Sequence, residues 1–107
     1  MKAIFDTYSK GNHNMNMSLF WEYKTDNFDF EKNAKLVATR VISLGTLEDW
    51  YAAFDIYGYM GFRKIAKEKV QGLDPKNFNF MCYALELNKE ETECYKSQLW
   101  RNQLLKY

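Results

Sequence analysis

The sequence predicts an all-α fold, a compact single domain of about five short amphipathic helices. Apolar side chains recur at intervals of three and four residues through most of the chain, which is the spacing of one helix face. The chain contains one proline and no useful run of alternating apolar and polar residues, so strands are not expected. Its length of 107 residues fits about one domain.

The first predicted helix runs from Phe28 to Leu44. Its inner face would consist of apolar residues spaced by four and three positions: Phe30, Ala34, Val37, Val41 and Leu44. Asp29 is the expected N-cap, because its carboxylate can accept an otherwise unpaired backbone N–H. Gly45 is expected to end the helix in the left-handed backbone conformation.

Two further helices are predicted between Thr46 and Leu73, as a helix-turn-helix-like pair in the middle of the chain. Thr46 and Asp49 have the spacing of a capping box, and Gly58 separates the two helices. Their inner faces would consist of Leu47, Trp50, Tyr51, Phe54 and Tyr57, and of Phe62, Ile65, Ala66, Val70 and Leu73. We expect Trp50 to be buried against the preceding helix. Compact helical proteins also show this outline without binding DNA.

The C-terminal part is predicted to form two more helices. Asp74 and Pro75 have the chemistry of an N-cap and a first helical residue. The inner stripe of that helix would consist of Phe78, Met81, Cys82 and Leu85. A last helix is predicted over Lys89–Lys106, because its acidic residues come early and its basic residues late, as the helix dipole favours.

Residues 1–16 are predicted to be a polar, flexible leader, and residues 17–107 the helical domain. The leader lacks the apolar segment of a signal peptide, and Met15 and Met17 are alternative translation starts to Met1. Two cysteines, expected as free thiols, and the lack of a membrane span indicate a cytoplasmic protein. The formal net charge of +1 gives no general attraction to nucleic acid.

Few residues are suited to catalysis. His13 is the only histidine, and in its polar surroundings we expect it to be solvated. Glu48 and Asp49 are neighbours on a predicted helix, so their carboxylates would point in different directions, and helix capping explains them. Cys82 and Cys94 with one distant histidine are too few for a zinc site. The sequence therefore predicts neither an enzyme nor a metal or cofactor site.

Two groups of residues are candidate contacts for a nucleic acid or a protein partner. The basic group lies on the outer face of the predicted helix and consists of Arg63, Lys64 and Lys67. A solvated face is the commoner outcome of such a pattern, and Tyr59–Lys69 lacks the Asn or Gln that often reads bases. The aromatic group consists of Trp21, Tyr23 and Trp100, which would either cover the core or form a partner-binding patch.

Four segments resemble a family of short uncharacterised bacterial helical proteins. In chain order they are L-F-W at Leu19–Trp21, R-V-I-S-L-G-T-L-E-D-W at Arg40–Trp50, Y-G at Tyr57–Gly58 and L-D-P-K-N-F-N-F at Leu73–Phe80. The resemblance covers roughly residues 19–95, and L-E-D-W is its most distinctive part. The chain departs from the family at Glu22, where Asp is frequent, and at Met81, where Trp is common.

Members of that family are often encoded beside nucleotidyltransferase toxins of the abortive-infection type. The resemblance implies an antitoxin or accessory role, and it supplies no site residues. The sequence therefore leaves two main functional hypotheses, ahead of a third and less favoured one, an undetected enzyme. The first is a non-enzymatic interaction protein whose partner is another protein, such as a toxin of this type. The alternative is a DNA-binding regulator that uses the helix over residues 59–71.

Overall fold

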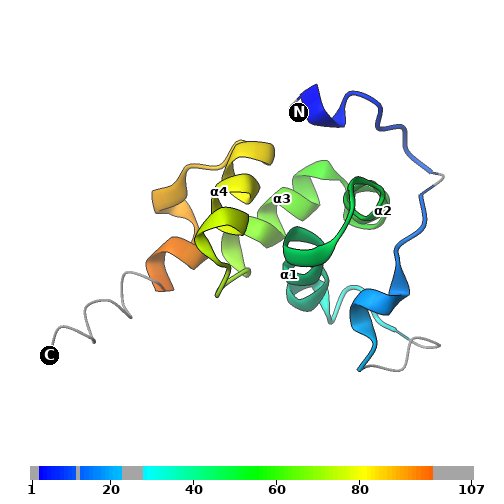
Figure 1. Ribbon diagram of the computed structural model, residues 1–107, viewed down its shortest axis with the longest axis horizontal. Helices are drawn as coiled ribbons and strands as arrows, with labels where there is room; N and C mark the ends of the chain where they lie inside the picture. The colour runs from blue at the N-terminus through cyan, green and yellow to red at the C-terminus, as the bar shows by residue number, and fades with distance from the viewer. Residues whose placement is uncertain (1–2, 12, 23–27, 98–107) are drawn as a thin grey trace, which may run out of the picture.

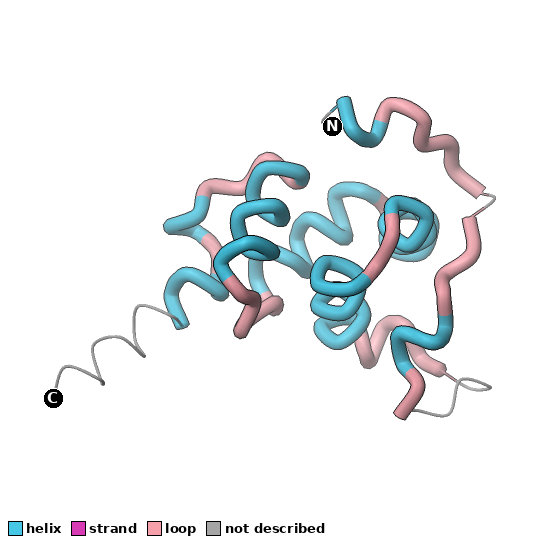
Figure 2. Tube along the Cα trace, in the orientation of Figure 1, coloured by secondary structure: helices cyan, strands magenta, loops and turns pink. Residues whose placement is uncertain are grey.

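A computed structural model of the chain describes residues 3–11, 13–22 and 28–97. In these ranges it contains four α-helices and three short 3-10 helices and no strand, which confirms the all-α prediction (Figure 1, Figure 2). The α-helices are α1 (Ala34–Leu44), α2 (Leu47–Tyr57), α3 (Tyr59–Glu68) and α4 (Pro75–Ala84). The 3-10 helices are η1 (Ala3–Phe5), η2 (Met17–Phe20) and η3 (Lys89–Glu91). Residues 93–97 are also helical.

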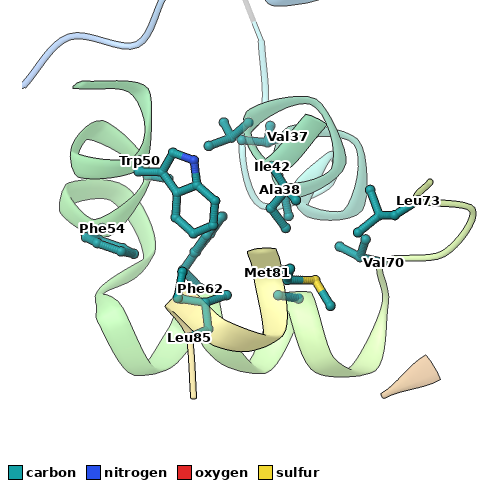
Figure 3. Close-up of a cluster of buried hydrophobic side chains, with 14 of the residues drawn as sticks. Val37, Ala38, Ile42, Trp50, Phe54, Phe62, Val70, Leu73, Met81 and Leu85 are labelled. Atoms are coloured by element: carbon teal, nitrogen blue, oxygen red, sulfur yellow. The ribbon is translucent and has the colours of Figure 1, made fainter. Parts of the chain in front are cut away.

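The helices pack around one core. Helix α1 contacts α2, α3 and α4, and Figure 1 shows α3 between α2 and α4. Trp50 on α2 is only 4% exposed and lies in this core, as predicted (Figure 3). Its ring packs edge-on against Phe62 of α3, with 5.5 Å between the ring centroids. Such aromatic contacts add to the stabilisation that burial itself provides.

The first helix begins later than predicted, at Ala34 rather than near Phe28. The carboxylate of Asp29 accepts the backbone N–H groups of Glu31 and Lys32, at 2.9 and 3.1 Å, so it stabilises a turn before α1 instead of capping the helix. The Tyr57 hydroxyl donates to the Phe30 carbonyl oxygen over 2.6 Å. This long-range bond holds the turn against α2, and local sequence could not show it.

Leu44 was wrongly assigned to the inner face of the first helix, since its side chain is 68% exposed. The buried stripe of α1 also contains Ala38 and Ile42, which the predicted face omitted. Successive helical residues are about 100° apart, so these two residues move the centre of the buried stripe away from Leu44. Leu44 therefore lies at the edge of the stripe, where α1 ends at the surface.

Gly45 does not adopt the predicted left-handed conformation, because its φ of −76° and ψ of 157° are those of extended backbone. The glycine is required by close approach instead. A Cβ atom at this position would lie 2.7 Å from the Val41 carbonyl oxygen and 3.0 Å from the Val41 Cα atom. Gly58, between α2 and α3, does have a positive φ of 76°, and there the predicted helix break is confirmed.

The C-terminal helices agree with the prediction in part. Asp74 caps α4 by accepting the backbone N–H of Asn77 over 2.7 Å, and Pro75 is the first helical residue, as predicted. The last helix does not begin at Lys89, where the chain forms η3, but after Thr92. The buried Thr92 hydroxyl accepts the backbone N–H of Tyr95 over 3.2 Å and so caps the new helix. Residues 98–107 of the predicted helix lie outside the described residues.

Both cysteines are buried thiols. Cys82 belongs to α4 and Cys94 to the helical residues 93–97, and both side chains are part of the core cluster. Burial raises the pKa of the Cys82 thiol above its usual value. A buried thiol with a raised pKa is a weak nucleophile, so Cys82 acts as a small apolar side chain here.

Candidate functional site

The capping box predicted at the N-terminus of α2 is present. The Asp49 carboxylate accepts the Thr46 backbone N–H over 2.9 Å, and the Thr46 hydroxyl oxygen accepts the Asp49 backbone N–H over 3.4 Å. The second carboxylate oxygen of Asp49 accepts the backbone N–H of Asn16 over 2.9 Å. Asp49 is only 2% exposed, so both of its oxygens are used in holding the chain together.

A second carboxylate on α2 binds the N-terminal segment. Asp55 accepts the Tyr8 hydroxyl over 2.8 Å and the backbone N–H groups of Gly11 and His13 over 3.0 and 3.2 Å. We call residues 4–11 and 13–16 the strap, because they run beside α2 (Figure 1, blue) and carboxylates of that helix hold them. The strap also supplies Phe5 to the core cluster. Flexibility of this segment in solution stays a prediction.

His13 is not the solvated residue that the sequence predicts. Its side chain is 13% exposed, and its Nδ1 atom lies 3.1 and 3.2 Å from the two carboxylate oxygens of Glu48. Its Nε2 atom lies 2.7 Å from the carbonyl oxygen of Ser9. Since both ring nitrogens have partners, the imidazole has no lone pair directed at solvent, as a general base would need. The arrangement holds the strap in place and offers little to a substrate.

Aromatic rings fill the space between the strap and α2. The His13 ring stacks on Tyr8, with 5.6 Å between centroids, and lies 5.0 Å from the ring of Tyr51. Phe5 packs edge-on against Phe54, with 5.0 Å between centroids. These contacts cover the aromatic face of α2 that the sequence predicts would be buried. Phe5, Tyr8 and His13 come from the N-terminal segment, which lacks helical periodicity.

The contact between the strap and α2 shifts the pKa values of one group on each side, Tyr8 and Asp55. Burial raises the pKa of Tyr8 to about 12, and its hydrogen bond to the Asp55 carboxylate adds to the shift. Burial opposes ionisation of Asp55, yet its bonds from Gly11, Tyr8 and His13 hold the pKa of that carboxyl below its usual value. Asp55 is therefore a carboxylate at neutral pH, and Tyr8 is a hydrogen-bond donor.

Residues 15–66 match a family of unknown function (DUF6922). This match fits the expectation of an uncharacterised family, while the gene neighbourhood of toxins stays a prediction. The matched segment contains η2, α1, α2 and most of α3, and so includes Glu48, Asp49 and Asp55. It includes neither His13 nor α4. No curated protein and no solved structure gives a significant match to the chain.

The three basic candidate residues on α3 have different surroundings. Arg63 was expected on a solvated outer face, but its guanidinium donates to the carbonyl oxygens of Leu85 and Glu86, over 2.8 and 2.9 Å. Lys67 forms an ion pair with Glu91 over 3.6 Å, and Lys64 is exposed. Arg63 therefore ties α3 to the end of α4, and Lys64 is the candidate that is most open to a partner.

Of the three aromatic candidates, the structure describes Trp21. It directly follows η2 and is 80% exposed, so it is not a core residue. Its neighbours in sequence are fixed to α1, because Arg40 donates to the Leu19 carbonyl oxygen over 2.7 Å and pairs with Glu22. Trp21 is thus an exposed side chain on a fixed backbone, which suits a partner contact. Tyr23 and Trp100 lie outside the described residues.

Sequence reasoning missed an exposed apolar surface around the end of α1 and the outer side of α4. We define the apolar surface by four side chains: Leu44 (68% exposed), Leu47 (47%), Phe80 (43%) and Tyr83 (59%). Leu47 lies one helical turn before Trp50, and Phe80 packs edge-on against the Trp50 ring, 5.6 Å away between centroids. One signal was in the sequence: Phe80 falls outside the inner stripe of its helix.

A shallow hollow of about 400 Å³ lies beside α1. Its lining is made of Lys32, Asn33, Lys35, Leu36, Thr39 and Gln71. It is open to solvent and lies apart from the strap and from the apolar surface. In the described part of the chain, no group of three or more His, Cys, Asp and Glu side chains could hold a metal ion. None of the described helices is long and apolar enough to cross a membrane.

Proposed function

We propose that this protein is a non-enzymatic interaction protein that binds another protein through its apolar surface. The observation that supports this proposal is the exposure of Leu44, Leu47, Phe80 and Tyr83 around a rigid, buried tryptophan. Apolar side chains that are exposed together are typical of protein-binding sites, because soluble monomers rarely leave large apolar patches in contact with water. Aromatic anchors on a fixed scaffold lose little conformational entropy when they bind.

The partner that we propose is a nucleotidyltransferase toxin of the abortive-infection type, which would make the protein an antitoxin or accessory subunit. This part of the proposal rests on the resemblance of the L-E-D-W and related segments to proteins encoded beside such toxins. A non-enzymatic role also agrees with the geometry of the residues that were candidates for catalysis. His13, Glu48 and Asp49 each direct their polar atoms at groups within the chain.

The alternative, a DNA-binding regulator that uses α3, has less support. Arg63, on which base reading would depend, directs its donors at two carbonyl oxygens of its own chain. An arginine that reads a guanine needs these donors free for the base. Exposed Lys64 could still contact phosphate, and such a contact alone would give weak binding that falls steeply with salt.

The test is co-expression of the protein with a nucleotidyltransferase toxin of the abortive-infection type, with growth rescue and complex formation as readouts. Leu44→Glu puts a charge on the apolar surface and should abolish both rescue and the complex. Met60→Glu is the matched control, because Met60 is similarly exposed (66%) but lies at the start of α3. Rescue that survives Leu44→Glu would contradict the surface, and absence of any complex would contradict the partner.

A further inference from the structure

The strap is held by side chains that lie far from it in the sequence. Besides the Tyr51 hydroxyl, which lies 2.6 Å from the Thr7 hydroxyl, its polar anchors include three carboxylates of α2: Glu48, Asp49 and Asp55. These three residues belong to the segment that matches the family, whereas His13 does not. Most of the strap thus precedes the matched segment, and acidic groups of a helix more than 30 residues away bind it.

The geometry at His13 requires a particular protonation state. Its two ring nitrogens face oxygen atoms that can only accept hydrogen bonds: the carboxylate of Glu48 at 3.1 Å and the carbonyl of Ser9 at 2.7 Å. A neutral imidazole carries one N–H, and the imidazolium carries two. Only the imidazolium can donate to both oxygens. When the proton is lost, one nitrogen lone pair must face an acceptor at hydrogen-bond distance.

The charges around His13 act in the same direction. From α2 it faces the carboxylates of Glu48 and Asp55, and Asp49 lies on the same turn as Glu48 with its oxygens bonded to Thr46 and Asn16. It also faces two aromatic rings, that of Tyr8 in the strap and that of Tyr51 on α2. The other charged residues of the strap, Asp6 and Lys10, are exposed.

We propose that His13 is a proton-controlled lock that fixes the strap to α2 in its imidazolium form and releases the strap when it is deprotonated. Release would uncover the aromatic face of α2 at Tyr51 and Phe54, which Phe5, Tyr8 and His13 cover in the docked state. This face borders the apolar surface, since Phe5 and Phe80 both contact the ring of Trp50. The lock itself does not depend on which partner the protein has.

The direction of the pH effect follows from linkage. Burial alone would lower the pKa of His13, but the bonds to Ser9 and Glu48 and the charges of Glu48 and Asp55 raise it above its usual value. A group whose pKa is raised by docking stabilises the docked state fully below its undocked pKa. That stabilisation is lost as the pH rises through the raised pKa. The size of the pH effect depends on the pKa difference between the docked and undocked states, since each unit changes the docking constant tenfold.

The experiment is an NMR titration of the full-length protein between pH 5 and pH 9. Because the chain has one histidine, its ring signals report His13 without ambiguity. Docking of the strap is followed by nuclear Overhauser contacts between the rings of Tyr8 and Tyr51, and by protection factors of the Gly11 and His13 amides. Protection factors remove the intrinsic pH dependence of amide exchange.

We expect the ring of His13 to titrate above its usual pKa and the amide protection to fall over the same pH range. Glu48→Gln should move both transitions to lower pH, and His13→Gln should abolish the pH dependence of protection. Glu68→Gln is the matched control, because Glu68 is an exposed carboxylate on α3, and it should change neither transition. A His13 pKa at or below the usual value, or protection that stays constant while His13 titrates, would overturn the proposal.

Discussion

The ring of Phe80 stands perpendicular to the ring of Trp50, with an interplanar angle of 90° and 5.6 Å between centroids. This contact joins a residue that is 43% exposed to one that is 4% exposed, so the apolar surface is a direct continuation of the core. Side chains that bind a partner would thus be supported by the same packing that stabilises the fold. The stability and the binding function of this region are expected to be linked but separable by mutation.

Trp50→Ala should lower the free energy of unfolding by about 3–5 kcal/mol, because it leaves a large cavity between α2, α3 and α4. Urea denaturation followed by circular dichroism measures this change. Trp21→Ala is the matched control, since that side chain is 80% exposed and should change stability by about 0.5 kcal/mol or less. A loss below about 1 kcal/mol for Trp50→Ala would show that the ring is not a core residue.

Glycine substitutions at two positions should have opposite signs. Gly45→Ala places a Cβ atom 2.7 Å from the Val41 carbonyl oxygen, which is backbone and cannot move easily, so we expect a loss of about 1–3 kcal/mol. Gly61→Ala lies within α3, where the new Cβ atom would meet the Tyr57 Cβ atom at an ordinary 3.6 Å, and should gain about 0.5–1 kcal/mol. Thermal melts of the two variants, recorded side by side, check this. Equal effects at the two positions would contradict the packing at Gly45.

Arg63→Ala should lower stability by about 1–3 kcal/mol, because it removes two charge-assisted bonds to the carbonyl oxygens of Leu85 and Glu86. Glu86 has a positive φ of 56°, an uncommon conformation for a residue other than glycine, and these bonds help to hold it. Arg63→Lys should recover only part of the loss, since lysine lacks the planar fork. Lys64→Ala on the same helix should stay within about 0.5 kcal/mol in the same urea titration. An unchanged urea midpoint for Arg63→Ala would contradict this structural role and favour Arg63 as a partner contact.

Asp49→Ala should cost about 1–2 kcal/mol, because it breaks the capping box and removes the acceptor of the Asn16 N–H. Amide exchange can separate the two effects: protection should fall both at Thr46 and at Asn16. Thr46→Ala is the matched variant, since it removes the hydroxyl cap while the bond from Asn16 to Asp49 remains. An equal loss of Asn16 protection in both variants would show that docking of the strap depends on the helix cap and not on the bond to the Asp49 carboxylate.

Features that depend on a few neighbouring residues could be predicted from the sequence. The capping box at Thr46 and Asp49, the cap and proline at Asp74–Pro75, and the break at Gly58 all involve residues within three positions of one another. The burial of Trp50 and Phe54 followed from helical spacing. The predictions for Leu44 and for the start of α1 were wrong because tertiary contacts, such as the bond from Tyr57 to Phe30, decide where the buried stripe begins and ends.

The strap could not be predicted in this way. His13 contacts Glu48 across 35 positions and Tyr8 contacts Asp55 across 47, and neither residue lies in a periodic pattern. A polar segment with several asparagines is typical of a disordered leader, and the composition holds no sign of the carboxylates that bind it. The apolar surface was missed for a related reason, because a pattern of apolar residues does not show which of them remain uncovered.

The reactivity of the two buried cysteines reports local opening of the C-terminal half of the protein. Cys82 is 5% exposed and Cys94 is not exposed, so a small thiol reagent can reach them only after α4 or the helical residues 93–97 have moved away from the core. The labelling rate under native conditions therefore measures how often the C-terminal half separates from the rest. Because the two thiols lie in different segments, their separate rates tell whether those segments detach together or one after the other.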